Sequence, residues 1–162
     1  IACLHRGKLE HAVIVDPVRR EEFTASRGRG AQCNGRRMRV SKLEGLDGAL
    51  LGTGIPFKNH CDELLGPYSE SVRLLAGQCA GIRRAGAAAL DLAYVAAGRL
   101  DAFWEVGLAR WDMAAGALLI REAGGLVADT DASDNYLDSG NIVCGNPKCF
   151  KAVLQVVKPL LG

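Results

Sequence analysis

The sequence predicts an α/β protein in which an antiparallel β meander is followed by alternating strands and helices. Residues 1–40 contain short runs of strand character separated by turn residues, and from residue 46 onward strand-like runs alternate with helical periodicity. In addition, 49% of the 162 residues are hydrophobic. A chain of this size and composition can bury a substantial core, so we expect a globular protein built of layers.

The first forty residues are expected to form the meander, because apolar and polar side chains alternate between turns. A Gly-rich bend ending at Asn34-Gly35 follows the last of its strands. Residues 28–48 and 131–139 are expected to be loops. The predicted strands are Ile1–Arg6, Glu10–Asp16 and Glu22–Ser26.

The rest of the chain is expected to form an α/β unit, because strand and helix patterns alternate along it. Strands are predicted at 49–53, 81–84, 100–105, 126–129 and 141–144. Helices are predicted at 61–78, 87–97, 111–123 and 147–160.

Candidate ligand-binding residues lie at the starts of two predicted helices. Gly86 opens the helix predicted over 87–97, and only methyl side chains follow it in the first turn. A helix start without bulky side chains leaves its N–H groups open to an anion such as phosphate, and Arg83 adds a positive charge. Close packing of helices would favour the same small residues, so both interpretations stay open.

Two acidic residues lie near the expected anion site. Asp112 begins the helix predicted over 111–123, where a carboxylate can cap free N–H groups or bind a cation. Glu105 ends a strand, and ligands of open α/β sheets gather at the carboxyl ends of strands. An ordinary surface role would also explain Glu105.

The remaining acidic residues are scattered, and no two of them form a tight Asp-x-Asp pair. A Mg²⁺ site needs about six oxygen ligands, some of them water. The six cysteines show neither a C-x-x-C pair nor histidine at zinc spacing. We therefore expect buried, reduced cysteines in a cytoplasmic protein, and no segment is apolar for long enough to span a membrane.

Basic residues cluster between residues 19 and 42, although the net charge is only +2. A solvated hairpin would explain them, and a docking surface for an acidic partner or nucleic acid is the functional alternative. No aromatic stacking pattern accompanies them, which disfavours sequence-specific nucleic-acid binding. The residues are Arg19, Arg20, Arg27, Arg29, Arg36, Arg37, Arg39 and Lys42.

Several motifs in one order resemble the inositol monophosphatase family, above all its bacterial members. The resemblance spans nearly the whole chain. It is carried by Phe23–Gly35, Arg84–Asp101, Trp104-Glu105, Trp111–Gly116, Arg121–Gly125 and Gly140–Pro147.

The resemblance implies a layered α+β sandwich of the sugar phosphatase type, with α-β-α-β-α layers. Residues 1–42 would be the last strands of an N-terminal sheet domain, and residues 43–162 would be the C-terminal α/β subdomain. Nothing in the chain matches the family's Glu-Glu and Asp-Pro-x-Asp-Gly-Thr segments, which carry most metal ligands and the water-activating Thr. Those catalytic residues would precede Ile1, so this chain alone is expected to be inactive.

The resemblance also implies Mg²⁺-dependent hydrolysis of a phosphate monoester, with myo-inositol 1-phosphate as the expected substrate. Asp112 would bind the metal, and Glu105 would bind sugar hydroxyls. The substrate-binding residues would be Arg83, Gly86, Ala87, Ala88 and Glu105, although Ala87 replaces the usual hydroxyl residue. Related enzymes accept histidinol phosphate, fructose bisphosphate or phosphoadenosine nucleotides. The resemblance further implies a homodimer and, as an alternative function, contacts with RNA polymerase and antitermination factors.

Overall fold

A computed structural model describes residues 1–56 and 61–162 of the chain. Its N-terminal part is an antiparallel sheet with the strand order β1-β2-β3-β4-β5, here called the meander sheet. Buried side chains alternate with exposed ones, so that Ala12, Ile14, Phe23, Ala25 and Ala31 share one face. The strands are β1 (Ala2–His5), β2 (Lys8–Asp16), β3 (Glu21–Ser26), β4 (Gly30–Cys33) and β5 (Arg36–Arg37).

The second sheet is mixed and has the order β7-β6-β8-β10-β9. Strand β6 (Leu50–Thr53) runs parallel to both β7 (Gly81–Arg83) and β8 (Ala102–Glu105). Strand β10 (Ile142–Gly145) pairs antiparallel with β8 and with β9 (Leu126–Ala128). Because three neighbouring strands are parallel, their carboxyl ends meet at one edge of the sheet.

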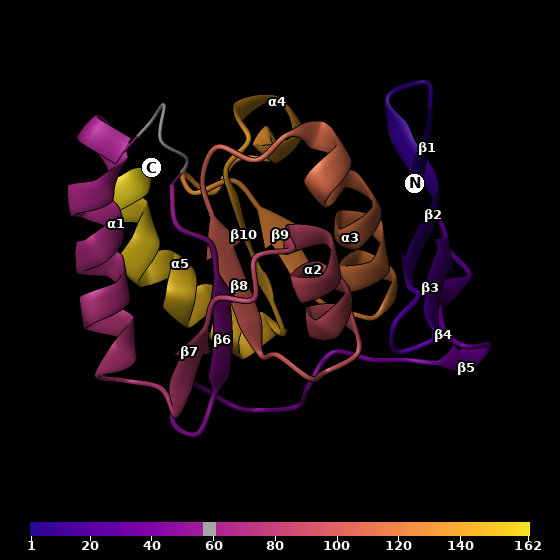
Figure 1. Cartoon of the computed structure of the whole chain (residues 1–162), viewed down its shortest axis with the longest axis horizontal. Coiled ribbons are helices and arrows are strands. Elements are labelled where there is room, and N and C mark those ends of the chain that lie inside the picture. The colour runs from indigo at the N-terminus through magenta and orange to yellow at the C-terminus, as the bar shows by residue number, and fades with distance from the viewer. Residues whose placement is uncertain (57–60) are drawn as a thin grey trace.

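The elements form four layers (Figure 1). Helices α2 (Ala88–Ala96) and α3 (Arg110–Glu122) lie between the two sheets, and their apolar residues join the inner face of the meander sheet in one core. Helices α1 (Cys61–Ala76) and α5 (Pro147–Leu161) cover the other face of the mixed sheet, where Leu75, Val153 and Val157 are buried. The shared core crosses the predicted domain boundary at residue 42, and that division stays a prediction.

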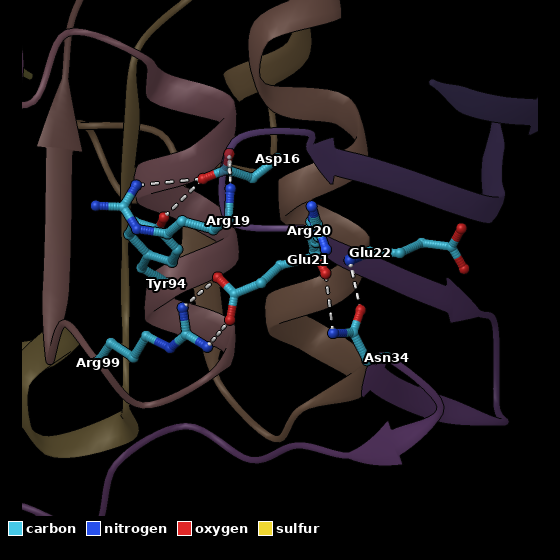
Figure 2. Close-up of polar contacts among 8 residues, drawn as sticks. All are labelled: Asp16, Arg19, Arg20, Glu21, Glu22, Asn34, Tyr94 and Arg99. Carbon is cyan, nitrogen blue, oxygen red and sulfur yellow. Dashed lines mark hydrogen bonds and ion pairs between the residues drawn. The ribbon is translucent and has the colours of Figure 1, made fainter.

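A polar network joins the turn between β2 and β3 to the last turn of α2 and the residues after it (Figure 2). The buried Asp16 carboxylate accepts hydrogen bonds from the backbone N–H groups of Val18 and Arg19, each at 3.0 Å, and from the Tyr94 hydroxyl at 3.3 Å. Arg99 forms a bidentate ion pair with Glu21, in which its Nη1 and Nη2 donate to the two carboxylate oxygens at 2.7 and 2.5 Å. This network holds the meander sheet against α2.

The predicted strands and helices are confirmed, apart from their exact ends and two segments expected to be loops. Strands β4 and β5 lie in the expected loop 28–48, and helix α4 (Tyr136–Ser139) lies in the expected loop 131–139. Both strands are short and gain their hydrogen bonds from β3 and from each other. Pairing between strands sets such elements, and local sequence carries little signal of it.

The structure also bears on the expectations about the cysteines and about membrane-spanning segments. Of the five described cysteines, all free, Cys144 and Cys149 are buried, whereas Cys3 is exposed on the edge strand β1; the expectation of buried cysteines was therefore wrong for Cys3. None of the described helices is long and apolar enough to cross a membrane.

Candidate functional site

A cavity of about 300 Å³ opens at the carboxyl ends of the three parallel strands. The segment after β6, the segment between β7 and α2, and the residues that lead from β8 into α3 all line it. This is the edge of an α/β sheet where ligands usually bind. The lining residues are Thr53, Gly54, Ile55, Pro56, Arg84, Gly86, Ala87, Ala88, Asp91, Glu105, Leu108 and Asp112.

The N-terminal end of α2 faces this cavity without a cap. Ala87 is the N-cap residue and has no side chain that can accept a hydrogen bond. Within the described residues, no hydrogen bond occupies the backbone N–H groups at 86–88. Free N–H groups at a helix start, together with the positive end of the helix dipole, form a site for an anion.

The structure corrects the predicted beginning of this helix. The helix begins at Ala88 and not directly after Gly86, which lies in a left-handed turn with φ of 87°. A Cβ at Gly86 would lie 3.3 Å from Arg84 Nη1, so the guanidinium group of Arg84 lies close to the turn.

The structure places Arg84, and not the predicted Arg83, in the wall of the cavity, and the binding role of Arg83 stays a prediction. Arg83 ends the edge strand β7, where it is exposed and donates a hydrogen bond to its neighbour, the Ile82 carbonyl, at 3.3 Å. Consecutive residues of an extended segment point to opposite sides, which accounts for the different surroundings of the two arginines.

Glu105 lies in the cavity wall and is 7% exposed, which is not the surface position considered above. A Cβ at Gly54 would overlap the Glu105 carboxylate, so only glycine leaves room for this side chain. The pKa of Glu105 is raised to about 7, mainly by burial and also by the charges of Asp91 and Asp112, against the opposing effect of Arg84. Glu105 therefore exchanges its proton near neutral pH.

Asp112 is half-buried in the first turn of α3 and lines the same cavity as residues 86–88. Its Oδ2 accepts a hydrogen bond from the Ala109 backbone N–H at 3.1 Å, which confirms the expected capping role. Among the described residues, no hydrogen bond or ion pair occupies Oδ1. Capping uses one carboxylate oxygen and leaves the other for a ligand.

Asp91 is an acidic residue of the cavity wall that the sequence patterns did not single out. It lies in the first turn of α2 and is 3% exposed. Its signal in the sequence is an acidic residue within the otherwise apolar run from Ala87 to Val95. Burial raises its pKa to about 6, with Arg84 acting in the opposite direction.

The fit of a divalent cation can be tested on these side chains. Asp112 offers the oxygen donor that such ions prefer. However, residues 1–56 and 61–162 contain no group of three histidine, cysteine or acidic side chains that could hold a metal ion. The described residues thus supply one candidate ligand, and an incomplete donor set.

We expect stability to depend on pH through Glu105. A carboxyl whose pKa is higher in the folded state stabilises the fold below its unfolded pKa, and this contribution is lost as pH rises through the folded value. For Glu105 that interval runs from the ordinary value of 4.5 to about 7, which corresponds to on the order of 3 kcal/mol. As the pH is raised from 4.5 to 8, the free energy of unfolding of Glu105→Gln should therefore fall by less than that of the unsubstituted chain. Urea unfolding at each pH measures both. Equal losses in both proteins would contradict this expectation.

A layered α/β fold with an anion-binding helix start and a carboxylate at one sheet edge defines a candidate phosphate-ester site. The model of the inositol monophosphatase family matches residues 1–159. The chain therefore belongs to that family, and the fold class expected from the resemblance is confirmed.

Relatives and solved structures agree with this assignment. The chain is 65% identical over 161 residues to a protein of Pseudomonas aeruginosa named Nus factor SuhB, covering 99% of this chain and 59% of that protein. It is 48% identical over 158 residues to an inositol-1-monophosphatase of Rhizobium meliloti, covering 98% and 59%. The crystal structure of extragenic suppressor protein suhB from Bartonella henselae superposes with a TM-score of 0.92 at 43% identity, covering 97% and 59%. The chain thus spans about 59% of the length of these relatives.

Proposed function

We propose that the full protein hydrolyses a phosphate monoester, and that myo-inositol 1-phosphate is its substrate. One observation carries this proposal: the uncapped start of α2 and the Asp112 carboxylate line the same cavity. The N–H groups at 86–88 and Arg84 would hold the phosphate, and Glu105 would accept hydrogen bonds from hydroxyl groups of the alcohol part. Family membership and a relative named inositol-1-monophosphatase support the same activity.

We further propose that Asp112 is one ligand of a divalent cation, with Mg²⁺ as the expected ion. When bound, such an ion neutralises phosphate charge and activates water. The remaining ligands would come from water, from the phosphate or from protein outside the described residues. The 162-residue chain alone is therefore expected to release no phosphate.

Metal removal tests this proposal. The full protein should release phosphate from myo-inositol 1-phosphate in the presence of Mg²⁺, and EDTA should abolish the release until Mg²⁺ is restored in excess. The same rate with and without EDTA would contradict the metal-dependent mechanism. A panel containing histidinol phosphate, fructose bisphosphate and a phosphoadenosine nucleotide would identify another preferred substrate.

A second candidate function is that of an accessory factor bound to the bacterial transcription machinery. It is supported by the relatives named Nus factor and by a second cavity, of about 480 Å³, lined by Arg36, Arg37 and Arg99. Arg99 is neutralised by Glu21, whereas Arg36 and Arg37 form no ion pair with any described residue. Exposed, unpaired arginines suit an acidic partner surface.

Purified RNA polymerase and elongation factors provide the test of this second function. The double variant Arg36→Glu/Arg37→Glu should lose capture, and unchanged capture would exclude this surface as the contact. A cytoplasmic location and a homodimer stay predictions.

A further inference from the structure

Asp91 differs from the other buried acids outside the cavity. The buried Asp16 and Asp129, each 4% exposed, have hydrogen-bond donors around them. Asp16 accepts from Val18, Arg19 and Tyr94, and Asp129 accepts from the Thr130 backbone N–H and the Ser139 hydroxyl. Such satisfaction is the rule for buried polar groups.

Asp91 and Glu105 lack such partners within the described protein. They are 3% and 7% exposed, and no described residue gives either carboxyl group a hydrogen bond or an ion pair. Both line the same cavity. No side-chain oxygen that is sealed from solvent lacks a hydrogen-bond partner among the described residues, so the free oxygens of these two carboxyls open into the cavity, where a ligand can reach them.

The surroundings limit what that ligand can be. The charge of Asp91 helps to raise the pKa of Glu105, and both residues line one cavity. The side chains at 86–88 cannot form hydrogen bonds, and Arg84 is the positively charged side chain that lines the cavity. An ionised carboxyl accepts hydrogen bonds, and a protonated one can also donate one. Neutral hydroxyl groups, which also both accept and donate, match such a pair.

We propose that Asp91 is a specificity-determining residue that, beside Glu105, binds a hydroxyl group of the substrate's alcohol part. This inference rests on the proposed phosphatase function and adds a residue to it. The phosphate would lie at the start of α2, and a polyol carrying neighbouring hydroxyls would reach both carboxyls. A phosphate ester whose ring lacks hydroxyls would leave both of them unpaired.

Isothermal titration of the full protein in EDTA, in which the esters are expected to stay intact, can separate this role from a structural one. The probes are myo-inositol 1-phosphate and cyclohexyl phosphate, which has a six-membered ring without further hydroxyls. The unsubstituted protein should prefer the inositol ester. Asp91→Ala should weaken binding of the inositol ester by about 10-fold and leave binding of the cyclohexyl ester unchanged, because one hydrogen bond to a charged group is lost. Asp91→Asn, which retains hydrogen-bonding atoms, should restore most of the preference.

The titration of Asp91→Ala needs a control variant and a measurement of its stability. Asp47→Ala, at an exposed position in the segment before β6, should change neither affinity. Thermal unfolding of Asp91→Ala should occur at an unchanged or higher temperature, because the substitution removes an unpartnered buried carboxyl. Equal weakening of both esters, or an unchanged preference, would overturn the role of Asp91 and leave the phosphatase proposal standing. If neither ester binds to the unsubstituted protein, both proposals fail.

Discussion

Replacement of Asp112 by asparagine is expected to slow Mg²⁺-dependent phosphate release by about 100-fold or more, the scale on which loss of one preorganised electrostatic group slows catalysis. Asn keeps an oxygen that can accept the Ala109 N–H, so the cap at the start of α3 should persist. The substitution removes the negative charge that the proposed cation needs. Initial rates over a range of Mg²⁺ concentrations measure the effect, and the Asp112→Asn protein should require more Mg²⁺.

The control for this experiment is Asp47→Asn, which removes the same charge from an exposed position away from the cavity. It should leave both the rate and the Mg²⁺ requirement unchanged. Circular dichroism and urea unfolding should show that Asp112→Asn retains its fold. A folded Asp112→Asn protein with an unchanged rate would exclude the proposed metal role.

Gly116→Ala is expected to reduce the free energy of unfolding by about 1 kcal/mol. Gly116 lies in α3 where that helix meets α2, and a Cβ there would lie 2.7 Å from Leu92 Cδ1 and closer still to Leu92 Cβ. Because Leu92 Cβ is fixed to its backbone, the two helices would have to separate. Overpacking of this kind costs about 1–3 kcal/mol and outweighs the roughly 1 kcal/mol that alanine gains over glycine in a helix.

Gly45→Ala, in the segment before β6, is the control, because a Cβ at Gly45 would meet nothing within 4 Å and Gly45 has no positive φ. Urea unfolding of this variant should show unchanged or increased stability. If Gly116→Ala were as stable as the unsubstituted chain, the close contact between α2 and α3 would not be required for the fold.

Much of the fold could be predicted because local patterns determine it. The meander strands alternate buried and exposed residues, and Gly98 and Gly124 mark the ends of α2 and α3 with positive φ values. Strands β4 and β5 were not predicted, because they are stabilised mainly by pairing with neighbouring strands and less by their own residues. The separation of the two sheets by α2 and α3 was expected only from the family resemblance.

The site was predicted less completely, for related reasons. Gly86, Ala87, Ala88, Glu105 and Asp112 all line the cavity, although their binding roles stay predictions. The choice between Arg83 and Arg84 depends on which side of an extended segment faces the sheet edge. The sequence alone does not show which of the two side chains lies on that side. The proposed role of Asp91 rests on the lack of a hydrogen-bond partner for its carboxyl group among the described residues. Hydrogen-bond partners are set by the fold and cannot be found in the sequence.

The central claim is that the backbone N–H groups at the start of α2 bind the phosphate of the substrate. The decisive measurement is backbone amide NMR of the full protein, titrated with myo-inositol 1-phosphate in EDTA so that the ester is not hydrolysed. The account predicts saturable chemical-shift changes at Gly86, Ala87 and Ala88, and none at Val18 and Arg19 in the turn between β2 and β3. Saturable binding that leaves the amides at 86–88 unmoved would contradict it.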